Sequence, residues 1–309
     1  MGKAKKPKPK VEPTEATEGE GEPHDEEIIS LSNKGEAEQV EERWEEVVEH
    51  SLSAVRSRTG RDTKTMDEVF DKPTLMTLYK MISNGFLENL DYPISTGKEA
   101  NVFHAKSPGD RSICVKIYRV NTATFHDMLP YIMGDPRFSG LKRDKRNLVQ
   151  AWAQKEYRNL GRMLEAGARV PEPIACQENV LLMEFVGSEE HPGRLLKDTP
   201  PQTQEDAKRI HDRLLSDYVK MVRNAGLVHA DFSEFNVLLD EKGEPVIIDC
   251  GQAVLTTHPM ADEFIRRDAN NFCRYFRKFG VKTTPEQFLK KCRWRQDDPA
   301  PPESREAKS

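Results

Sequence analysis

The stretch that decides the fold is residues 226–252, GLVHADFSEFNVLLDEKGEPVIIDCGQ. Two short apolar runs, residues 237–239 and 246–248, flank the turn sequence DEKGEP. Runs of this length, rich in Val, Ile and Leu and separated by Gly and Pro, predict a β-hairpin. The stretch therefore predicts two paired strands that are preceded by a polar loop.

Three side chains with hard oxygen ligands gather at one end of this hairpin. Asp231 and Asn236 lie in the loop, and Asp249 ends the second strand. Such ligands suit Mg²⁺, which binds one or two carboxylates and leaves positions for phosphate oxygens and water. The order also follows the kinase pattern H-R-D-x-x-x-x-N and D-F-G, in which the first Asp accepts the substrate proton and the Asn and second Asp hold metal.

The alternative interpretation is an ordinary hairpin with solvated acids. His229, two residues before Asp231, and Gly251, two residues after Asp249, both match the kinase pattern. Together with the hairpin between them, they favour a phosphoryl-transfer site.

Lys116 lies in the middle of an apolar run, residues 113–118, ICVKIY. In a strand it shares one face with Cys114 and Tyr118. A lysine there is usually an exposed residue of an edge strand, and a buried one needs a partner.

Helical phase supplies a candidate partner. In the helix predicted over residues 147–165, Glu156 lies within an apolar stripe, four residues after Trp152 and four before Leu160. An acid in such a stripe is destabilising unless it is paired. We expect Lys116 and Glu156 to form the ion pair that positions nucleotide phosphates in kinases. The alternative is a Glu at the margin of the stripe.

The loop STGKEA separates two predicted strands within residues 94–105, and its backbone N–H groups are candidates for phosphate contacts. It is neither a P-loop nor the G-x-G-x-x-G of protein kinases, and an ordinary hairpin turn is the alternative. With Lys116 nearby, the candidate ATP-binding residues are Ser95, Thr96, Gly97, Lys98, Glu99, Ala100 and Val102.

Two further strands are predicted at residues 174–176 and 180–185. In a two-lobed kinase the second runs into the hinge, where backbone groups of Glu184 and Val186 bind an adenine edge. An ordinary strand has the same pattern.

The chain of 309 residues is long enough for one large or two modest domains. Its 36% hydrophobic content is low because the two ends have little to bury, and we expect them to be disordered. Residues 119–146 are predicted to be a long connection that covers the site or contacts RNA. Helices are expected at residues 39–55, from Lys72 to Gly85, and at 204–224, 259–279 and 285–291. The expected organisation is tail 1–36, N-terminal helices 37–88, N-lobe 89–186, C-lobe 187–293 and tail 294–309.

Charge and cysteine content argue against several classes of protein. The net charge of −5 argues against a general nucleic-acid binder, although residues 1–50 carry most of the acidic excess. Five cysteines without C-x-x-C spacing indicate reduced thiols in the cytoplasm. No apolar stretch approaches the roughly 18 residues of a membrane span, and no signal peptide is recognised, so no membrane association is expected.

The segments STGKEANVFHA, VKIY, WAQKEYRNL, PEPI, LLMEFVG, LVHADFSEFNVLL and IIDCGQAV resemble, in order, the RIO family of atypical serine/threonine kinases, type-one branch, near its archaeal members. The resemblance covers about residues 70–290. It implies an α+β, two-lobed kinase-like fold with a small antiparallel-sheet N-lobe, a reduced helical C-lobe without an A-P-E motif, and helices in front. It also implies ATP and Mg²⁺, with Mn²⁺ as an alternative ion, and a role in maturation of the small ribosomal subunit.

Carried over by position, the resemblance makes Asp231 the proton acceptor, Asn236 and Asp249 the metal ligands, and Lys116 a phosphate contact. Asp249 also matches the residue that becomes an aspartyl-phosphate, which suits ATP hydrolysis. Implied partners are pre-ribosomal small subunits with their rRNA, and a protein substrate or the chain itself through autophosphorylation. A departure is Cys250-Gly251-Gln252, where relatives often carry a Val-Ser-Gln type sequence.

Two other functions compete with a RIO-type kinase. Small-molecule kinases of the aminoglycoside or choline type share H-x-D-x-x-x-x-N but need an acidic pocket for a cationic substrate. Here the corresponding region is basic, which instead suits rRNA phosphates; its residues are Arg266, Arg267, Arg274, Arg277 and Lys278. The third candidate is a nucleotide-sensing assembly factor in which catalysis is not required.

Overall fold

The computed structural model describes residues 70–120, 125–138, 140, 144–188 and 191–294. The chain divides into two units, residues 1–47 and 48–309, and the described residues all belong to the second. The predicted tail at residues 1–36 and the predicted helix at 39–55 lie outside the described residues, as do residues 295–309 of the predicted C-terminal tail.

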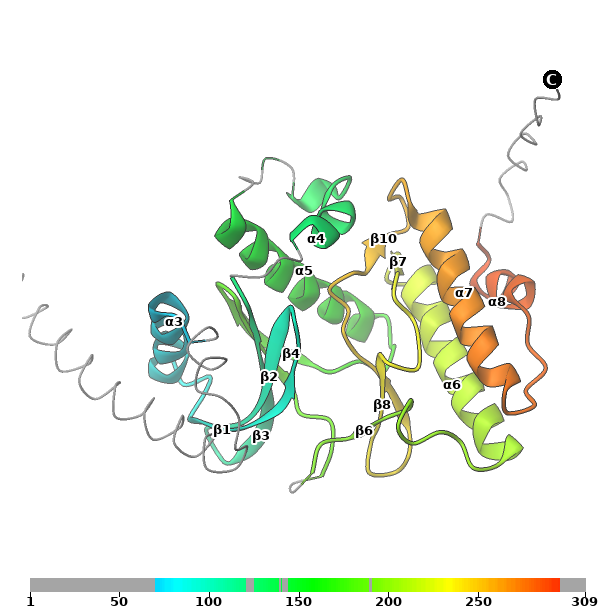
Figure 1. The fold of residues 1–309 in the computed structure, drawn as a ribbon, viewed down its shortest axis with the longest axis horizontal. Helices are drawn as coiled ribbons and strands as arrows, with labels where there is room; N and C mark the ends of the chain where they lie inside the picture. Colours follow the sequence, from blue (N-terminus) through cyan, green and yellow to red (C-terminus); the bar gives the residue numbers. More distant parts are fainter. Residues whose placement is uncertain (1–69, 121–124, 139, 141–143, 189–190, 295–309) are drawn as a thin grey trace, which may run out of the picture. The chain divides into compact units, whose positions relative to one another are not determined.

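An antiparallel five-stranded sheet forms the first part of the described fold (Figure 1). In spatial order it contains β1 (Asn89–Thr96), β2 (Ala100–Ser107), β3 (Arg111–Tyr118), β5 (Val180–Glu184) and β4 (Pro173–Gln177). The strand β3 is central, which explains why its alternating apolar residues are buried on both faces. Lys116 is therefore on a central strand, with 8% of its surface exposed, and not on an edge.

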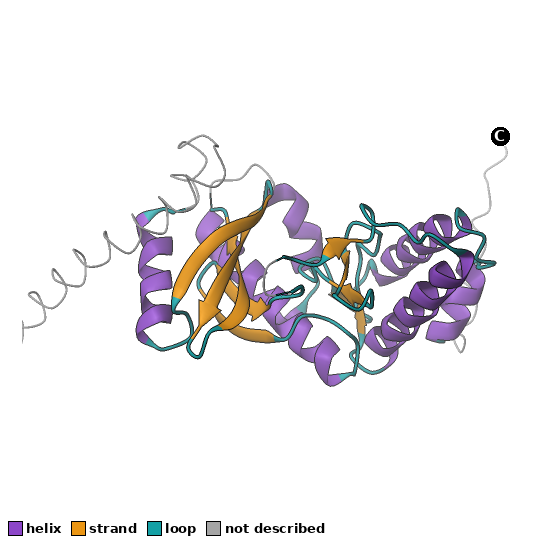
Figure 2. Cartoon of the chain, turned by 90° about the horizontal axis from the view of Figure 1, so that it is seen from below, coloured by secondary structure: helices purple, strands orange, loops and turns teal. Residues whose placement is uncertain are grey.

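Two capped helices flank this sheet. The helix α3 (Lys72–Ser83) begins where the Asp71 carboxylate accepts the Thr74 N–H at 2.9 Å. The helix α5 (Lys145–Glu165) begins in the same way, with Asp144 accepting the Asn147 N–H at 3.0 Å. Both helices were predicted, and α5 lies between the sheet and the helical part of the fold (Figures 1 and 2).

The prediction that residues 119–146 form an irregular connection is wrong in part. The segment contains the helix α4 (Phe125–Ile132) and the short 3₁₀ turn η1 (Pro136–Phe138). Met128 and Ile132 are buried at helical spacing, and the Tyr131 ring stacks on Phe264 at 5.1 Å. Packing against a distant helix thus stabilises a segment whose Gly, Pro and charges indicate a loop.

Three helices form the second part of the fold: α6 (Gln204–Arg223), α7 (Ala261–Arg277) and α8 (Pro285–Cys292). The rings of Tyr218, Phe232, Phe272 and Phe288 form one aromatic cluster between them. All three helices were predicted to within a few residues. No helix in the described part of the chain combines the length and apolarity that crossing a membrane requires.

Short strands join this helical part to the sheet. The predicted hairpin is present as β8 (Val237–Leu239) and β9 (Pro245–Ile247), with Val237 opposite Ile247 and β6 (Arg194–Leu195) alongside β8. A second pair contains β7 (Leu227–Val228) and β10 (Val254–Leu255). The hairpin places Asp249 two residues beyond the end of β9.

Candidate active site

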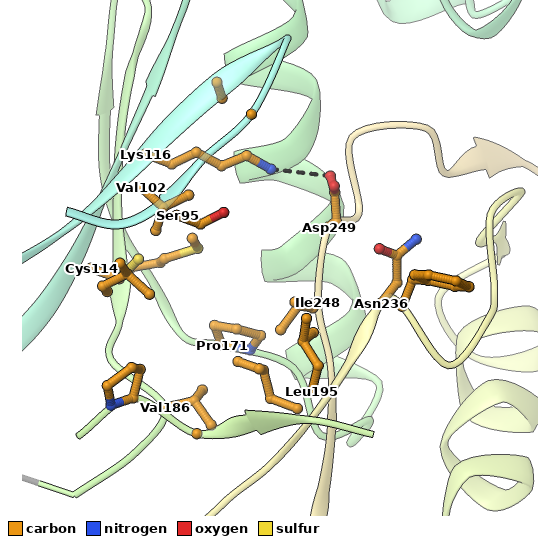
Figure 3. Close-up of a pocket in the computed structure, with 18 of the residues that line it drawn as sticks. Ser95, Val102, Cys114, Lys116, Pro171, Val186, Leu195, Asn236, Ile248 and Asp249 are labelled. Atoms are coloured by element: carbon orange, nitrogen blue, oxygen red, sulfur yellow. Dashed lines mark hydrogen bonds and ion pairs between the residues drawn. The ribbon is translucent and has the colours of Figure 1, made fainter. Parts of the chain in front are cut away.

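A cavity of about 840 Å³ is lined by residues of the five-stranded sheet and by residues of the β8–β9 hairpin region (Figure 3). Thr96 is the one predicted site residue that does not line it. The predicted residues that do are Ser95, Gly97, Lys98, Glu99, Ala100, Val102, Lys116, Glu156, Glu184, Val186, Asp231, Asn236 and Asp249.

The predicted ion pair between Lys116 and Glu156 is present. The Lys116 Nζ atom lies 3.0 and 2.8 Å from the two Glu156 carboxylate oxygens, and 3.0 Å from Asp249 Oδ1 (Figure 3). The Tyr118 hydroxyl donates a further hydrogen bond to Glu156. Glu156 is 1% exposed, so its carboxylate is held by these donors and not by water.

The charges of this group depend on one another. Burial disfavours the Lys116 ammonium, but the Asp249 and Glu156 carboxylates outweigh burial and raise its pKa. The same ammonium holds the pKa of Asp249 below its usual range. Burial raises the pKa of Glu156, and Lys116 opposes that effect. A lysine that stays charged is therefore available for phosphate oxygens, beside an Asp249 side chain that is 52% exposed.

His229 joins the loop of Asp231 to the strand that ends near Asp249. Its Nε2 atom lies 3.2 Å from the Ile248 carbonyl, and its Nδ1 atom accepts the Asp231 N–H at 3.3 Å. These neighbours assign the ring proton to Nε2. Asn236 donates through Nδ2 to the Asp231 carbonyl at 2.8 Å and to its carboxylate at 2.9 Å. The Asp231 carboxylate is thus oriented by its own loop.

Asp268 of α7 is a site residue that the sequence analysis missed. It is fully buried and accepts the N–H groups of Ala230 at 2.8 Å and Phe232 at 2.9 Å. It thereby holds the backbone on both sides of Asp231, including Ala230 at φ 67°. The sequence does contain a signal for Asp268. It lies four residues after Phe264 and four before Phe272, so it is an acid within a helical apolar stripe, and the same argument identified Glu156.

The oxygen ligands available in the site suit Mg²⁺. Because Asn236 Nδ2 binds Asp231, its Oδ1 atom is left as an acceptor on the side that faces Asp249 (Figure 3). Within the described residues, no three His, Cys, Asp or Glu side chains form a metal site. One amide oxygen and one carboxylate suit an ion that takes its other ligands from phosphate and water.

The two predicted base-binding residues, Glu184 and Val186, lie at the end of β5 and just after it. The Glu184 N–H donates to the Glu172 carbonyl at 2.8 Å, and the Val186 carbonyl accepts the Gly193 N–H at 2.7 Å. Outside those bonds lie the Val186 N–H, in the loop after β5, and the Glu184 carbonyl, which belongs to the paired strand β5; an adenine edge pairs with a neighbouring donor and acceptor of this kind.

Three basic residues of α7 form hydrogen bonds within the protein. Arg266 binds Asp262 at 2.8 Å, and Arg267 donates to the Ala230 carbonyl. Arg277 donates to the Cys273 carbonyl at 3.2 Å. These side chains are exposed at the surface, but Arg267 also supports the loop of Asp231.

Burial raises the pKa of Asp231, which His229 and Asn236 only partly oppose. The predicted role of Asp231 as proton acceptor requires an ionised carboxylate, so we expect activity to be lost as pH falls through this raised pKa. We expect the acid limb of the profile of kcat against pH to lie above about 3.9, the usual Asp value. Single-turnover phosphoryl transfer between about pH 4 and 8 measures it. The Glu156→Gln variant should keep the same acid limb in its residual activity. If the acid limb disappears in that variant, the titrating group is Glu156 and not Asp231.

A small antiparallel sheet, a helical second part, and a cavity with a Lys–Glu pair facing Asp, Asn and Asp define the protein-kinase-like class. The model of the RIO domain matches residues 101–288. The chain belongs to the RIO family of serine/threonine-protein kinases, which confirms the predicted family and fold class.

Several of the relatives it resembles are Rio1 kinases. It is 42% identical to the RIO-type serine/threonine-protein kinase Rio1 of Haloferax volcanii, over 74% of this chain and 77% of that protein. The Methanocaldococcus jannaschii Rio1 is 37% identical over 87% of this chain and 89% of the relative. The Caenorhabditis elegans kinase RIO1 is 41% identical over 73% of this chain but 44% of that longer protein. In fold it is similar to the solved Rio2 kinase of Chaetomium thermophilum, with a TM-score of 0.53, 23% identity, and coverage of 71% of this chain and 66% of that one.

Proposed function

We propose that this kinase transfers the γ-phosphoryl group of ATP, bound with Mg²⁺ or Mn²⁺, to a serine or threonine hydroxyl of a protein. One observation carries the proposal: Lys116, Asp231, Asn236 and Asp249 line the same cavity, and Glu156 holds the lysine.

Each side chain has a defined role in the transfer. Asp231 accepts the hydroxyl proton as the nucleophile attacks, and the hydrogen bonds from Asn236 orient its carboxylate. Asn236 Oδ1 and Asp249 hold the metal ion, which neutralises charge on the phosphates. Lys116 contacts the phosphates and keeps its position because Glu156 binds it. The Glu184 carbonyl and Val186 N–H bind the adenine edge.

Hydrolysis of ATP through Asp249 is a second activity that the geometry favours. The Asp249 carboxylate is half exposed and kept ionised by Lys116, as a nucleophile must be. Its oxygen would bond to the γ-phosphorus as the bond to the β–γ bridging oxygen breaks and ADP leaves. Water would then release phosphate and restore the carboxylate. The solved Rio2 neighbour is described as an ADP/Mg²⁺-phosphoaspartate complex.

We propose small ribosomal subunit maturation in the cytoplasm as the setting, with pre-ribosomal particles and their rRNA as partners. The basic residues on α7 support an rRNA contact, and five free cysteines support a reducing compartment. The family resemblance supports this setting, together with these two features.

Replacing Asp231 by Ala is expected to abolish phosphoryl transfer while ATP still binds, because the change removes the proton acceptor and no predicted ATP contact. The assay uses the full chain, radiolabelled ATP and Mg²⁺, with small-subunit precursors, an aminoglycoside or choline as acceptors. Label on a small molecule would support the small-molecule kinase, and equal turnover by the variant would refute Asp231 as the base.

Hydroxylamine-sensitive label on the chain, lost in Asp249→Asn, would support the aspartyl-phosphate.

A further inference from the structure

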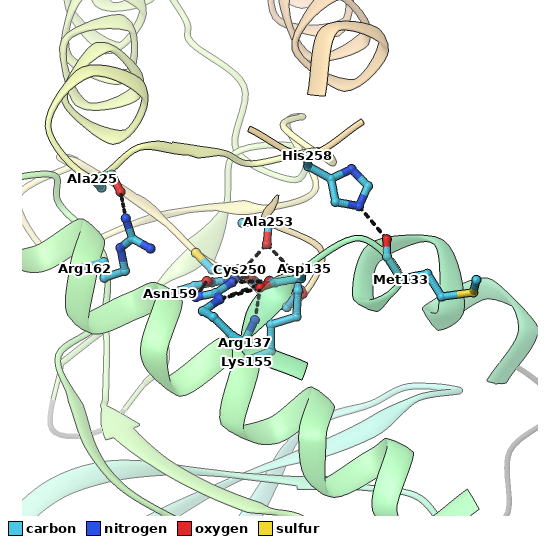
Figure 4. Close-up of polar contacts among 11 residues, drawn as sticks. Met133, Asp135, Arg137, Lys155, Asn159, Arg162, Ala225, Cys250, Ala253 and His258 are labelled. Carbon is cyan, nitrogen blue, oxygen red and sulfur yellow. Dashed lines mark hydrogen bonds and ion pairs between the residues drawn. The ribbon is translucent and has the colours of Figure 1, made fainter. Parts of the chain in front are cut away.

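Lys155, next to Glu156 on α5, is completely buried and takes no part in the proposed chemistry. Its Nζ atom donates to the Gly251 carbonyl at 2.7 Å and to the Ala253 carbonyl (Figure 4). Burial lowers the pKa of Lys155 to about 7. A buried lysine is costly unless its ammonium group is hydrogen-bonded, so the carbonyls that Lys155 binds are part of its role.

Asn159, one helical turn further along α5, binds the same segment. Its Nδ2 atom donates to the carbonyls of Cys250 and Ala253, each at 2.9 Å. Lys155 and Asn159 together make a carbonyl clamp: four hydrogen bonds from one helix to the carbonyls of Cys250, Gly251 and Ala253.

The clamp is tied to the segment after α4. Arg137 donates to Asn159 Oδ1 at 3.0 Å, which fixes the orientation of the amide. Arg137 in turn donates to both carboxylate oxygens of Asp135, to Oδ1 at 2.9 Å and to Oδ2 at 2.6 Å (Figure 4). Asp135 is buried, so this ion pair is part of the packed structure and not a surface contact.

The segment that the clamp holds directly follows Asp249. The chain leaves β9 at Ile247, and Asp249 has φ 58°, in the left-handed region that is unfavourable for non-glycine residues. The carbonyls after it lie outside the strand β9, and a buried carbonyl without a partner costs about 1–3 kcal/mol. Such a backbone conformation persists when its surroundings determine it.

We propose that Lys155 and Asn159 are positioning residues that fix the backbone after Asp249 and thereby aim its carboxylate at the metal ion. The proposal rests on the proposed function, in which Asp249 is a metal ligand. Because Glu156 on the same helix holds Lys116, α5 sets the positions of both the phosphate-binding lysine and the metal-binding aspartate. The Arg137–Asp135 pair makes this setting dependent on the segment after α4.

The test is the Mg²⁺ dependence of Lys155→Met, which removes the donors and keeps much of the side-chain volume. Loss of a residue that orients a metal ligand lowers metal affinity or activity about 10–100-fold. We expect the Mg²⁺ concentration that gives half-maximal transfer to rise by about tenfold or more. The affinity for ADP in Mg²⁺-free buffer should stay within about twofold, because no predicted base or phosphate contact changes.

A second readout needs neither nucleotide nor metal. In the free full chain, amide hydrogen exchange at residues 250–253 should be faster in Lys155→Met than in the parent, since the clamp no longer holds this backbone. If the parent shows no Mg²⁺-dependent transfer, the proposed function fails, while the exchange measurement still tests the clamp.

Arg162→Gln is the matched control. Arg162 also lies on α5 and donates to a backbone carbonyl of the helical part, Ala225 at 2.6 Å, away from Asp249 (Figure 4). It should leave the Mg²⁺ dependence unchanged. An equal shift in Arg162→Gln, or unchanged Mg²⁺ dependence and exchange in Lys155→Met, would overturn the proposal. If Lys155→Met fails to fold, Arg137→Gln, at a half-buried position, should give a smaller shift in the same direction, and no shift would count against the clamp.

Discussion

Replacing Lys116 by Met is expected to lower kcat/KM for ATP by about 10²–10³-fold, the usual cost of removing one preorganised charge from a transition state. Lys116 is the cation that joins Glu156 to Asp249, with its Nζ atom within 3.0 Å of both. Removal also leaves the buried Glu156 carboxylate without its partner, which costs about 3–5 kcal/mol of stability. Steady-state kinetics and thermal unfolding measure the two effects separately.

A double variant separates catalysis from stability. Adding Glu156→Gln to Lys116→Met removes the unpaired buried carboxylate, so part of the lost stability should return. Activity should stay low, since the cation is still missing. Recovery of both would mean that the pair is only structural, and near-parental kcat/KM in the single variant would remove Lys116 from the mechanism.

Replacing Gly251 by Ala is expected to have the second large effect. A Cβ atom at this position would lie 2.8 Å from Trp152 Nε1 and 3.3 Å from Glu156 Oε2. The side chains of Trp152 and Glu156, or the helix α5 that carries them, must shift to admit it, which costs about 1–3 kcal/mol as overpacking does. Because the displaced groups include the partner of Lys116, turnover should fall about tenfold or more, as when an orienting residue is lost. Turnover and unfolding temperature of the full chain provide the measurement.

Gly161→Ala is the control for this change. Gly161 lies on the same helix, and the nearest atom to its Cβ would be Pro173 Cγ at 3.9 Å, an ordinary contact. Alanine within a helix should stabilise the protein by about 0.5–1 kcal/mol with unchanged turnover. A Gly251→Ala variant that behaves like Gly161→Ala would show that the close approach is unimportant.

The parts of the site that could be predicted are those with a local periodic signal. The hairpin follows from two apolar runs around DEKGEP, and Glu156 follows from its place in a helical apolar stripe. Lys116 stands out because charge is unusual in an apolar strand. The same stripe argument would have identified Asp268, whose importance comes from the N–H groups it accepts.

The remaining parts depend on contacts that no local pattern reveals. Lys155 binds backbone carbonyls nearly a hundred residues away, and carbonyls are present at every position, so the sequence gives no sign of which ones it selects. The helix α4 is likewise stabilised by Tyr131 on Phe264, a contact between distant segments. Thr96 shows a further limit: it is the last residue of β1, and because neighbouring side chains of a strand point to opposite faces, Ser95 lines the cavity and Thr96 does not.

Asp268 accepts main-chain N–H groups, which explains how the loop of Asp231 can differ in amino-acid composition from the corresponding loop of other kinases. The carboxylate recognises the peptide groups of residues 230 and 232 whatever side chains they carry. Ala230 can therefore occupy the position where the H-R-D pattern has arginine, and Arg267 reaches its carbonyl from α7. The conformation of the loop that carries Asp231 is thus held through its peptide groups, and a sequence search that requires arginine at position 230 would miss chains held in the same way.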